Sequence, residues 1–202
     1  MRPEQLLPAG TIERAAAEAK GQRITESAGA DGMWYVIQVY TGQEMEIAQK
    51  CRDRVIEEDE DVFVPLAERQ TKLRGEWQLV RTRLFPGYVF IETDRPRELY
   101  MRLKEIKVMT RLLTTGEEIT PLYRDEEDYL RSLQDEAHVV RYSEGYLEGD
   151  RLVVTEGALA GYEGKIKKIL RHKCLVVLEV PLLGRTVEVT LGLGVVEKRG
   201  EC

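Results

Sequence analysis

The spacing of short apolar runs near the C-terminus restricts the fold of this chain more than any other feature. Within about fifty residues, five runs rich in β-branched side chains alternate with turns that contain glycine. Runs of this length are typical of strands, and their close spacing is typical of a small β-barrel. The five predicted strands are Asp150–Thr155, Gly164–Leu170, Cys174–Val180, Thr186–Thr190 and Val195–Lys198.

The segment before this barrel has a different pattern, in which strand-like and helix-like stretches alternate. Met33–Tyr40 is an aromatic and β-branched run, typical of a buried strand. Thr41 and Glu44 then have the spacing of a capping box, and apolar residues at three- and four-residue steps predict a helix that ends near Glu58. Further strands are expected over Asp61–Lys72, Trp77–Arg83, Leu84–Ile91 and Val108–Leu113, and helices over Pro96–Lys104 and from Thr120–Pro121 to Gln134.

This order predicts an α+β chain in which an antiparallel sheet with flanking helices precedes the small barrel. Residues 1–32 contain few large apolar side chains, so we expect a flexible N-terminal extension. Residues 33–136 form the α+β domain and residues 137–147, which are short and polar, a linker. The barrel domain then covers residues 148–202.

Composition excludes several classes of protein. The net charge of −6 and the pI of about 5.2 argue against a uniformly cationic nucleic-acid binder, although a local basic patch is compatible with them. Apolar stretches are far shorter than a membrane span, so we expect no membrane partner. The three cysteines are scattered and have no CxxC spacing, which argues against a disulfide framework or a zinc site and favours a reducing cytoplasm.

Enzyme motifs are incomplete. Gly161–Lys165 resembles the end of a phosphate loop, but Leu159 stands where the first glycine belongs and Ile166 where the metal-binding hydroxyl belongs. The two histidines, His138 and His172, have no fixed acidic neighbour in the sequence. We therefore expect no catalytic residue, no metal and no cofactor.

Two motifs about a hundred residues apart resemble those of NusG-type transcription factors. Trp34–Val39 with Thr41–Glu44, followed by Leu84–Phe90, is similar to the N-terminal (NGN) domain of that family. Gly149–Val154 with Glu156–Ile166 is similar to a KOW motif. The resemblance implies an NGN-like domain followed by an SH3-like barrel, in a protein that binds the clamp helices of the largest subunit of RNA polymerase. We expect a monomer.

The resemblance also assigns residues to polymerase binding. Phe85 lies beside the rigid Pro86–Gly87 turn and is the expected anchor in a groove for a partner helix. Tyr88, Gln38 and Lys50 occupy neighbouring positions of the family pattern. The alternative is that Phe85 and Tyr88 are ordinary core side chains.

Two groups of basic residues are candidates for nucleic-acid contact. The first lies on the predicted hairpin and would bind non-template DNA in the transcription bubble; the alternative is a solvated ribbon. The second lies in the barrel and would bind a nascent RNA hairpin, with Tyr162 stacking on a base; the alternative is a solvated barrel face. The hairpin group is Arg69, Lys72, Arg74, Arg81 and Arg83, and the barrel group is Lys165, Lys167, Lys168, Arg171 and Lys173.

The barrel departs from the pattern of housekeeping NusG proteins. Leu183–Val189 lacks the aromatic residue and the proline of the surface that binds the Rho terminator or a ribosomal protein. This departure favours a specialised factor, most like LoaP, that promotes antitermination at selected operons. The alternatives are a housekeeping elongation and termination factor and a ribosome-associated KOW protein, which should lack the Trp34 and Phe85 motifs.

Overall fold

The first sheet of the N-terminal domain is antiparallel and has the strand order β2-β5-β1-β6. The computed structural model describes residues 32–105, 111–112, 114–115, 118–149 and 151–197. The expected flexible extension therefore lies almost entirely outside the described residues. The two central strands, β1 and β5, pair along their whole length. The strands are β1 (Met33–Gln38), β2 (Asp61–Phe63), β5 (Tyr88–Thr93) and β6 (Arg111–Leu112).

Both faces of this sheet are apolar, and each is covered by a different layer. Tyr35 and Ile37 face one buried cluster, which includes residues of helices α2 (Glu44–Arg54) and α3 (Pro96–Glu105). Trp34 and Val36 face the other cluster, which includes leucines of helix α4 (Arg124–Leu133). Alternation along a strand sends successive side chains to opposite faces, so a strand buried on both faces is apolar throughout.

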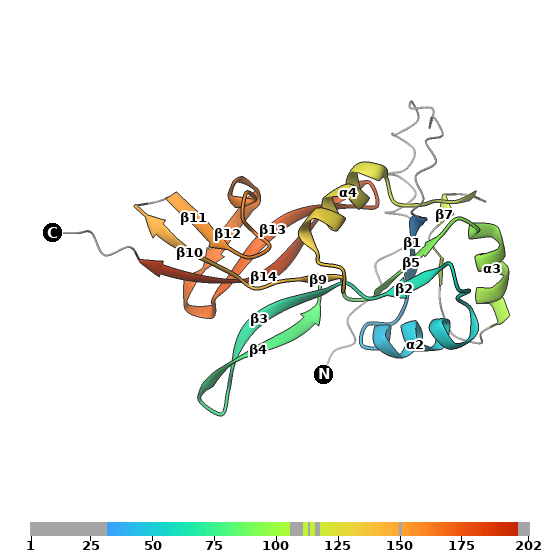
Figure 1. The fold of residues 1–202 in the computed structure, drawn as a ribbon, viewed down its shortest axis with the longest axis horizontal. Helices are drawn as coiled ribbons and strands as arrows, with labels where there is room; N and C mark the ends of the chain where they lie inside the picture. The colour runs from blue at the N-terminus through green and yellow to red at the C-terminus, as the bar shows by residue number, and fades with distance from the viewer. Residues whose placement is uncertain (1–31, 106–110, 113, 116–117, 150, 198–202) are drawn as a thin grey trace.

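A second sheet carries a long hairpin that projects away from the rest of the fold (Figure 1). Its strand order is β4-β3-β9, and β9 pairs with β3 in parallel. The turn residues Arg74 and Gly75 have φ angles of 52° and 90°, as a two-residue hairpin turn requires. The strands are β3 (Leu66–Leu73), β4 (Glu76–Arg83) and β9 (Val139–Val140); a separate pair joins β7 (Thr114–Thr115) to β8 (Glu118–Ile119).

The C-terminal domain is a strongly curled sheet with the order β11-β10-β14-β13-β12. It forms a small SH3-like barrel, so the predicted α+β class with an NGN-like domain and a barrel is confirmed. Two short 3-10 helices, η1 and η2, flank β12. The elements are β10 (Ser143–Glu148), β11 (Arg151–Glu156), η1 (Glu163–Lys165), β12 (Ile166–Leu170), η2 (Arg171–Lys173), β13 (Leu175–Leu182) and β14 (Arg185–Glu197).

The predicted linker and the last two predicted strands are wrong. Residues 137–147 contain β9 and most of β10; the segment is polar because only one face of β10 is buried. The strands expected over Thr186–Thr190 and Val195–Lys198 are one strand, β14, which continues through Gly192 and Gly194. These glycines allow close approach of another segment and do not form turns.

Several element boundaries in the N-terminal domain also differ from the prediction. Helix α2 begins at Glu44 with Gln43 at the N-cap position, so Thr41 does not cap it, and the helix ends at Arg54. Helix α4 begins at Arg124, after Tyr123, and Thr120–Pro121 precedes it in extended chain. The strand expected over Asp61–Lys72 is interrupted before β3, and β5 begins only after the Pro86–Gly87 turn.

The two domains pack directly against each other. One buried cluster is shared between the second face of the first sheet, α4 and the barrel, whose contributions include Leu182 and Leu193. Strand β14 crosses β3 so closely at Gly192 that a Cβ there would lie 2.5 Å from the Glu68 carbonyl oxygen and 2.5 Å from Tyr142 Cδ2. Figure 1 shows α4 between the barrel and the first sheet.

Gly192→Ala tests this crossing. A methyl group has no space there, so we expect the domains to move apart or the free energy of unfolding to fall by about 1–3 kcal/mol. Small-angle scattering measures the first effect, as a larger radius of gyration, and thermal denaturation the second. Gly164→Ala is the matched control, since a Cβ at that position would point into open space. An unchanged radius and melting temperature for Gly192→Ala would contradict the tight crossing.

Candidate functional site

Phe85, the expected polymerase anchor, is a core side chain in this arrangement. It is 2% exposed, and its ring lies 5.8 Å from that of Phe90 in the cluster shared by the two domains. The alternative of an ordinary core side chain therefore describes Phe85 in the packed chain, because the cluster continues from the sheet into α4 and the barrel. Its role in polymerase binding stays a prediction.

Two of the other predicted polymerase-binding residues lie beside this position. Gln38 and Tyr88 are directly opposite each other on β1 and β5, and both are half-buried. The Tyr88 hydroxyl accepts a hydrogen bond from Nη2 of Arg185, at the start of β14. Phe85, Gln38 and Tyr88 thus belong to the sheet face that α4 and the barrel cover.

Lys50 lies elsewhere. It is on the exposed side of α2 and forms a 2.6 Å ion pair with Glu46. The buried side of α2 packs on the opposite face of the first sheet from Phe85. The structure therefore does not bring Lys50 to the Phe85 face.

The turn that carries Phe85 is held by a buried carboxylate. Glu44 is 0% exposed; its Oε1 accepts a 2.7 Å hydrogen bond from the Gly87 N–H. Its Oε2 accepts from the Gly42 N–H at 2.8 Å and lies 2.8 Å from Arg83 Nε. The sequence pattern assigned Glu44 to a helix cap. Its contacts with Gly87 and Arg83 became apparent only in the folded chain.

A second buried carboxylate joins the domains. Glu126 is 2% exposed; its Oε1 accepts a 2.7 Å hydrogen bond from Gly184 at the β13–β14 turn. Its Oε2 accepts from the Tyr123 N–H at the start of α4. Burial raises the pKa of Glu126, and the backbone N–H groups act in the opposite direction.

Tyr162 is part of the same contact and is not a free stacking surface. Its hydroxyl is 2.6 Å from the Ser132 hydroxyl on α4, and its ring meets Tyr129 edge to face at 5.4 Å. The predicted base-stacking role would therefore require the barrel to leave α4.

Strand alternation divides the basic residues of the hairpin. Lys72, Arg81 and Arg83 share one face of the ribbon, whereas Arg69 is on the other and Arg74 is in the turn. Arg81 pairs with buried Glu68 and Arg83 with buried Glu44. The predicted five-residue DNA contact is therefore not one continuous patch.

The barrel's basic residues are exposed, and Lys167 is paired with acidic side chains. Lys167 Nζ lies 2.6 Å from Glu188 and 3.1 Å from Glu179, and these carboxylates raise its pKa. The acids come from neighbouring strands, so the absence of acids along the run itself did not reveal them. Lys165, Lys168, Arg171 and Lys173 are also exposed.

Sequence reasoning missed two exposed apolar side chains on the hairpin. Trp77 and Leu79 on β4 are 48% and 54% exposed. The sequence contained a signal for this exposure. Trp77 and Leu79 are two residues apart, on the same face of a strand in a predicted hairpin, near the hairpin tip, where no other described element covers either face.

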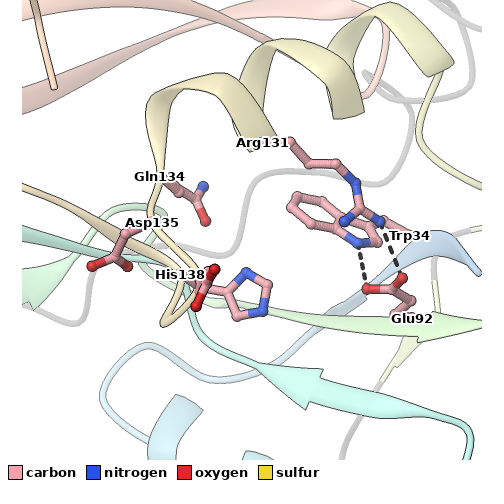
Figure 2. A pocket seen from close by; sticks show the side chains of 7 residues that line it. Trp34, Glu92, Arg131, Gln134, Asp135 and His138 are labelled. Atoms are coloured by element: carbon pink, nitrogen blue, oxygen red, sulfur yellow. Dashed lines mark hydrogen bonds and ion pairs between the residues drawn. The ribbon is translucent and has the colours of Figure 1, made fainter. Parts of the chain in front are cut away.

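A cavity of about 410 Å³ lies between the first sheet and the end of α4 (Figure 2). Trp34 Nε1 donates to Glu92, and the Arg131 guanidinium lies over the Trp34 ring at 4.5 Å. His138 stacks on Phe63, and burial lowers its pKa. Trp34, Glu92 and Arg131 thus satisfy one another, whereas the buried side-chain amide of Gln134, which also lines the cavity, has no hydrogen-bond partner in the described part of the chain. Within the described ranges, no group of three or more His, Cys, Asp or Glu side chains is placed to hold a metal.

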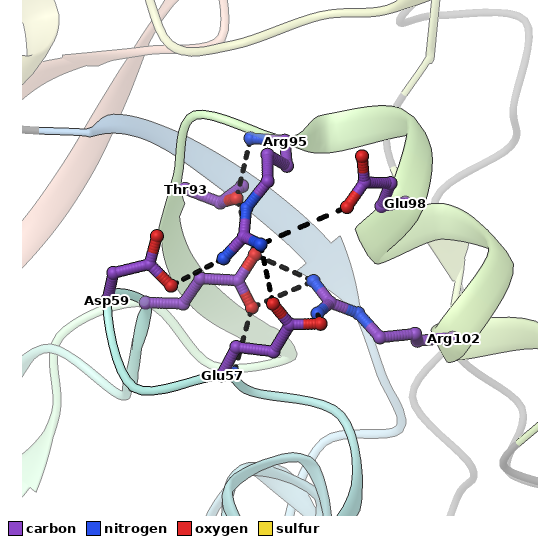
Figure 3. Close-up of polar contacts among 7 residues, drawn as sticks. Glu57, Asp59, Thr93, Arg95, Glu98 and Arg102 are labelled. Carbon is purple, nitrogen blue, oxygen red and sulfur yellow. Dashed lines mark hydrogen bonds and ion pairs between the residues drawn. The ribbon is translucent and has the colours of Figure 1, made fainter.

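Charged residues of α3 and of the segment between α2 and β2 form a structural network (Figure 3). Glu60 is buried and accepts hydrogen bonds from Arg102 at 2.7 Å and from the Thr93 hydroxyl at 2.6 Å. Arg95 pairs with Glu57 at 2.6 Å and also with Asp59. The network ties α3 to the segment between α2 and β2.

Comparison with known proteins places the chain in a family. A family model described as "Transcription termination factor nusG" matches residues 32–131. A "Transcription termination/antitermination protein NusG" of Xylella fastidiosa (strain Temecula1 / ATCC 700964) is 32% identical over 181 residues, which cover 82% of this chain and 98% of that protein. The chain belongs to the NusG family.

Other relatives carry the same name and align over similar lengths. The Haemophilus influenzae protein is 29% identical over 82% of this chain and 93% of its own length. The Campylobacter jejuni protein is 25% identical over 82% of this chain and 96% of its own length. Among the described helices, none is long and apolar enough to cross a membrane.

Glu126→Ala tests the buried carboxylate between the domains. The change leaves the Gly184 and Tyr123 N–H groups without their acceptor, so we expect the free energy of unfolding to fall by about 1–3 kcal/mol. Urea denaturation measures it. Asp125→Ala, an exposed acid in the same helical turn, is the control and should change little. Equal stability of both variants and the unchanged protein would contradict this role for Glu126.

Proposed function

We propose that this protein is a transcription elongation factor that binds RNA polymerase through its N-terminal domain. The observation that carries the proposal is the NusG-family match, which includes both the β1 motif and the turn that carries Phe85. Support also comes from the geometry: Gln38, Tyr88 and Phe85 share one sheet face, and Glu44 holds the turn beside them. We place the contact with the clamp helices of the polymerase on this face.

The barrel covers this face in the packed chain, so polymerase binding requires the β13–β14 turn to move away. The contacts to be broken include the hydrogen bond from Arg185 to Tyr88 and that from Gly184 to Glu126. Phe85 then becomes available to a partner. In this proposal the chain acts as a monomer and uses one apolar face for two purposes.

We further propose that the factor promotes processive antitermination at selected operons, as LoaP-type proteins do, and that its barrel contacts nascent RNA. The exposed barrel cations Lys165, Lys168, Arg171 and Lys173 support this proposal. The second candidate is a housekeeping elongation and termination factor whose barrel binds Rho or a ribosomal protein. The pairing of Lys167 with two acids favours it, because that pairing reduces the charge offered to RNA.

Polymerase binding is tested by titrating purified core polymerase with the full chain. Truncating Phe85 would open the core, so the informative variant is Gln38→Ala combined with Tyr88→Ala. We expect it to weaken binding at least tenfold, which corresponds to about 1.4 kcal/mol. Lys50→Ala, on the other side of the sheet, should bind as the unchanged protein does. If Lys50→Ala weakens binding more than the double variant, the contact lies on the α2 layer instead.

RNA binding by the barrel is tested at two salt concentrations with structured leader RNA from the protein's own operon. Affinity should fall steeply with salt, because each neutralised phosphate releases condensed counterions. Lys168→Ala should lower affinity and flatten the salt dependence, whereas Lys167→Ala should have a smaller effect since two carboxylates already neutralise Lys167. If the full chain fails to bind RNA, and a Gly192→Ala variant whose radius of gyration shows separated domains fails as well, the housekeeping candidate is preferred.

A further inference from the structure

The cavity beside α4 contains a side-chain amide whose donor and acceptor are both unused. The nitrogen and the oxygen of the Gln134 amide are buried, and neither has a hydrogen-bond partner in the described part of the chain. Gln134 follows the last residue of α4, and Figure 2 shows its amide turned towards the side of the cavity that Trp34 and His138 line. Buried polar groups almost always have a partner, so an amide without one in its own chain indicates a group supplied from outside.

The size of the cavity fits a small molecule. Its volume of about 410 Å³ lies within the range of pockets that hold small ligands, roughly 300–1,000 Å³. The lining residues come from the first sheet, from α4 and from the turn that follows α4. The cavity is therefore formed by the N-terminal side of the molecule, without a lining residue from the described part of the barrel.

His138 gives the cavity a flat aromatic wall. One face of its ring stacks on Phe63, with the ring centres 3.5 Å apart and the planes inclined by 6°. Because Phe63 covers that face, the rest of the ring faces the cavity that His138 lines. The backbone of His138 has a φ of 55°, a value that is unusual for a residue with a side chain and that is found preferentially at functional sites. Burial lowers the pKa of His138, so its ring is neutral at pH 7.

The charges around the cavity disfavour an anionic ligand. Three acids line it, Glu92, Asp135 and Glu136, against one cation, Arg131. Arg131 is paired with Glu92, and Asp135 is paired with Arg141. The charge that remains is the exposed carboxylate of Glu136, which forms no ion pair with a described residue. A phosphate group would meet this carboxylate without a free cation beside it, so an uncharged ligand fits the lining better.

We propose that this cavity binds an uncharged nucleoside, with adenine as the preferred base. Adenine presents its N6 amino group beside a ring nitrogen, which is the complement of a side-chain amide, and glutamine pairs with it through two hydrogen bonds. Pairing of the base edge with Gln134 leaves the plane of the base to stack on the ring of His138, as unpaired bases stack on histidine elsewhere. The two atoms of Gln134 that lack partners would then both have one.

This inference goes beyond the proposed function and does not depend on it. The residues of the proposed polymerase contact, Gln38, Tyr88 and Phe85, do not line the cavity. A chain that fails to bind polymerase can therefore still bind adenosine, and the reverse also holds.

The test titrates adenosine into the full chain by isothermal titration calorimetry. We expect saturable binding of adenosine, and binding of 5′-AMP that is weaker by about tenfold or more, because the phosphate is repelled by Glu136. Guanosine and uridine should also bind more weakly than adenosine. Tighter binding of either would overturn the assignment to adenine. No saturable binding of adenosine at millimolar concentration would mean that the cavity holds solvent only, and would overturn the proposal.

Gln134→Leu removes the two polar atoms and nearly preserves the size of the side chain. Binding of adenosine should weaken by about tenfold or more, since two hydrogen bonds to the ligand are lost. The melting temperature should not fall, because the amide forms no hydrogen bond that the folded chain would lose. Gln78→Leu, the same change at an exposed site on the hairpin, is the matched control. Unchanged adenosine binding by Gln134→Leu, or a melting temperature that falls in this variant alone, would overturn the role of the amide.

Glu136→Lys tests the charge of the lining without a change in the core. Replacing the carboxylate by an ammonium group should strengthen binding of 5′-AMP and reduce its disadvantage relative to adenosine. Asp128→Lys makes the same change in net charge at an exposed position of α4 that does not line the cavity, and should leave the preference as it is. An equal effect of both variants, or none of either, would place the ligand outside this cavity and overturn the proposal.

Discussion

The structure depends on a sheet that is apolar on both faces. Trp34, Val36 and Phe90 point to one side of β1 and β5, and Tyr35 and Ile37 to the other, so water must be excluded from both. Helices α2 and α3 close one side. The other side is covered by α4 and the barrel together. The buried cluster continues into the barrel, so the contact between the two domains is part of the hydrophobic core.

Buried carboxylates fix the positions of specific turns and arginines within this apolar packing. Glu44 binds the turn at Gly87 and Arg83, Glu68 binds Arg81 and Arg141, and Glu126 binds the β13–β14 turn. A buried carboxylate without partners would be costly, so each one fixes the position of the N–H groups or guanidinium that satisfies it. The pairs of Glu44 and Glu68 also hold the arginines of the hairpin in place.

This arrangement gives the protein surfaces of two kinds. The Phe85 face is apolar and is already occupied within the molecule, so any partner there competes with the barrel. The exposed side chains Trp77 and Leu79 lie on the projecting β3–β4 hairpin, away from the face that the barrel covers.

The amino-acid sequence by itself determined the α+β class, the barrel and the family, because periodicity, turn residues and local motifs are properties of neighbouring residues. It did not determine that Phe85 is buried, that Lys50 lies across the sheet, or that Glu188 neutralises Lys167, since each depends on segments that meet only after folding. The limits of β10 and β14 were missed for a related reason. Ser143–Glu148 is polar on the face it turns to water, and Gly192 admits a neighbouring strand where a turn was expected. Only the tertiary structure decides which surface remains open, because burial is a property of all the elements packed together.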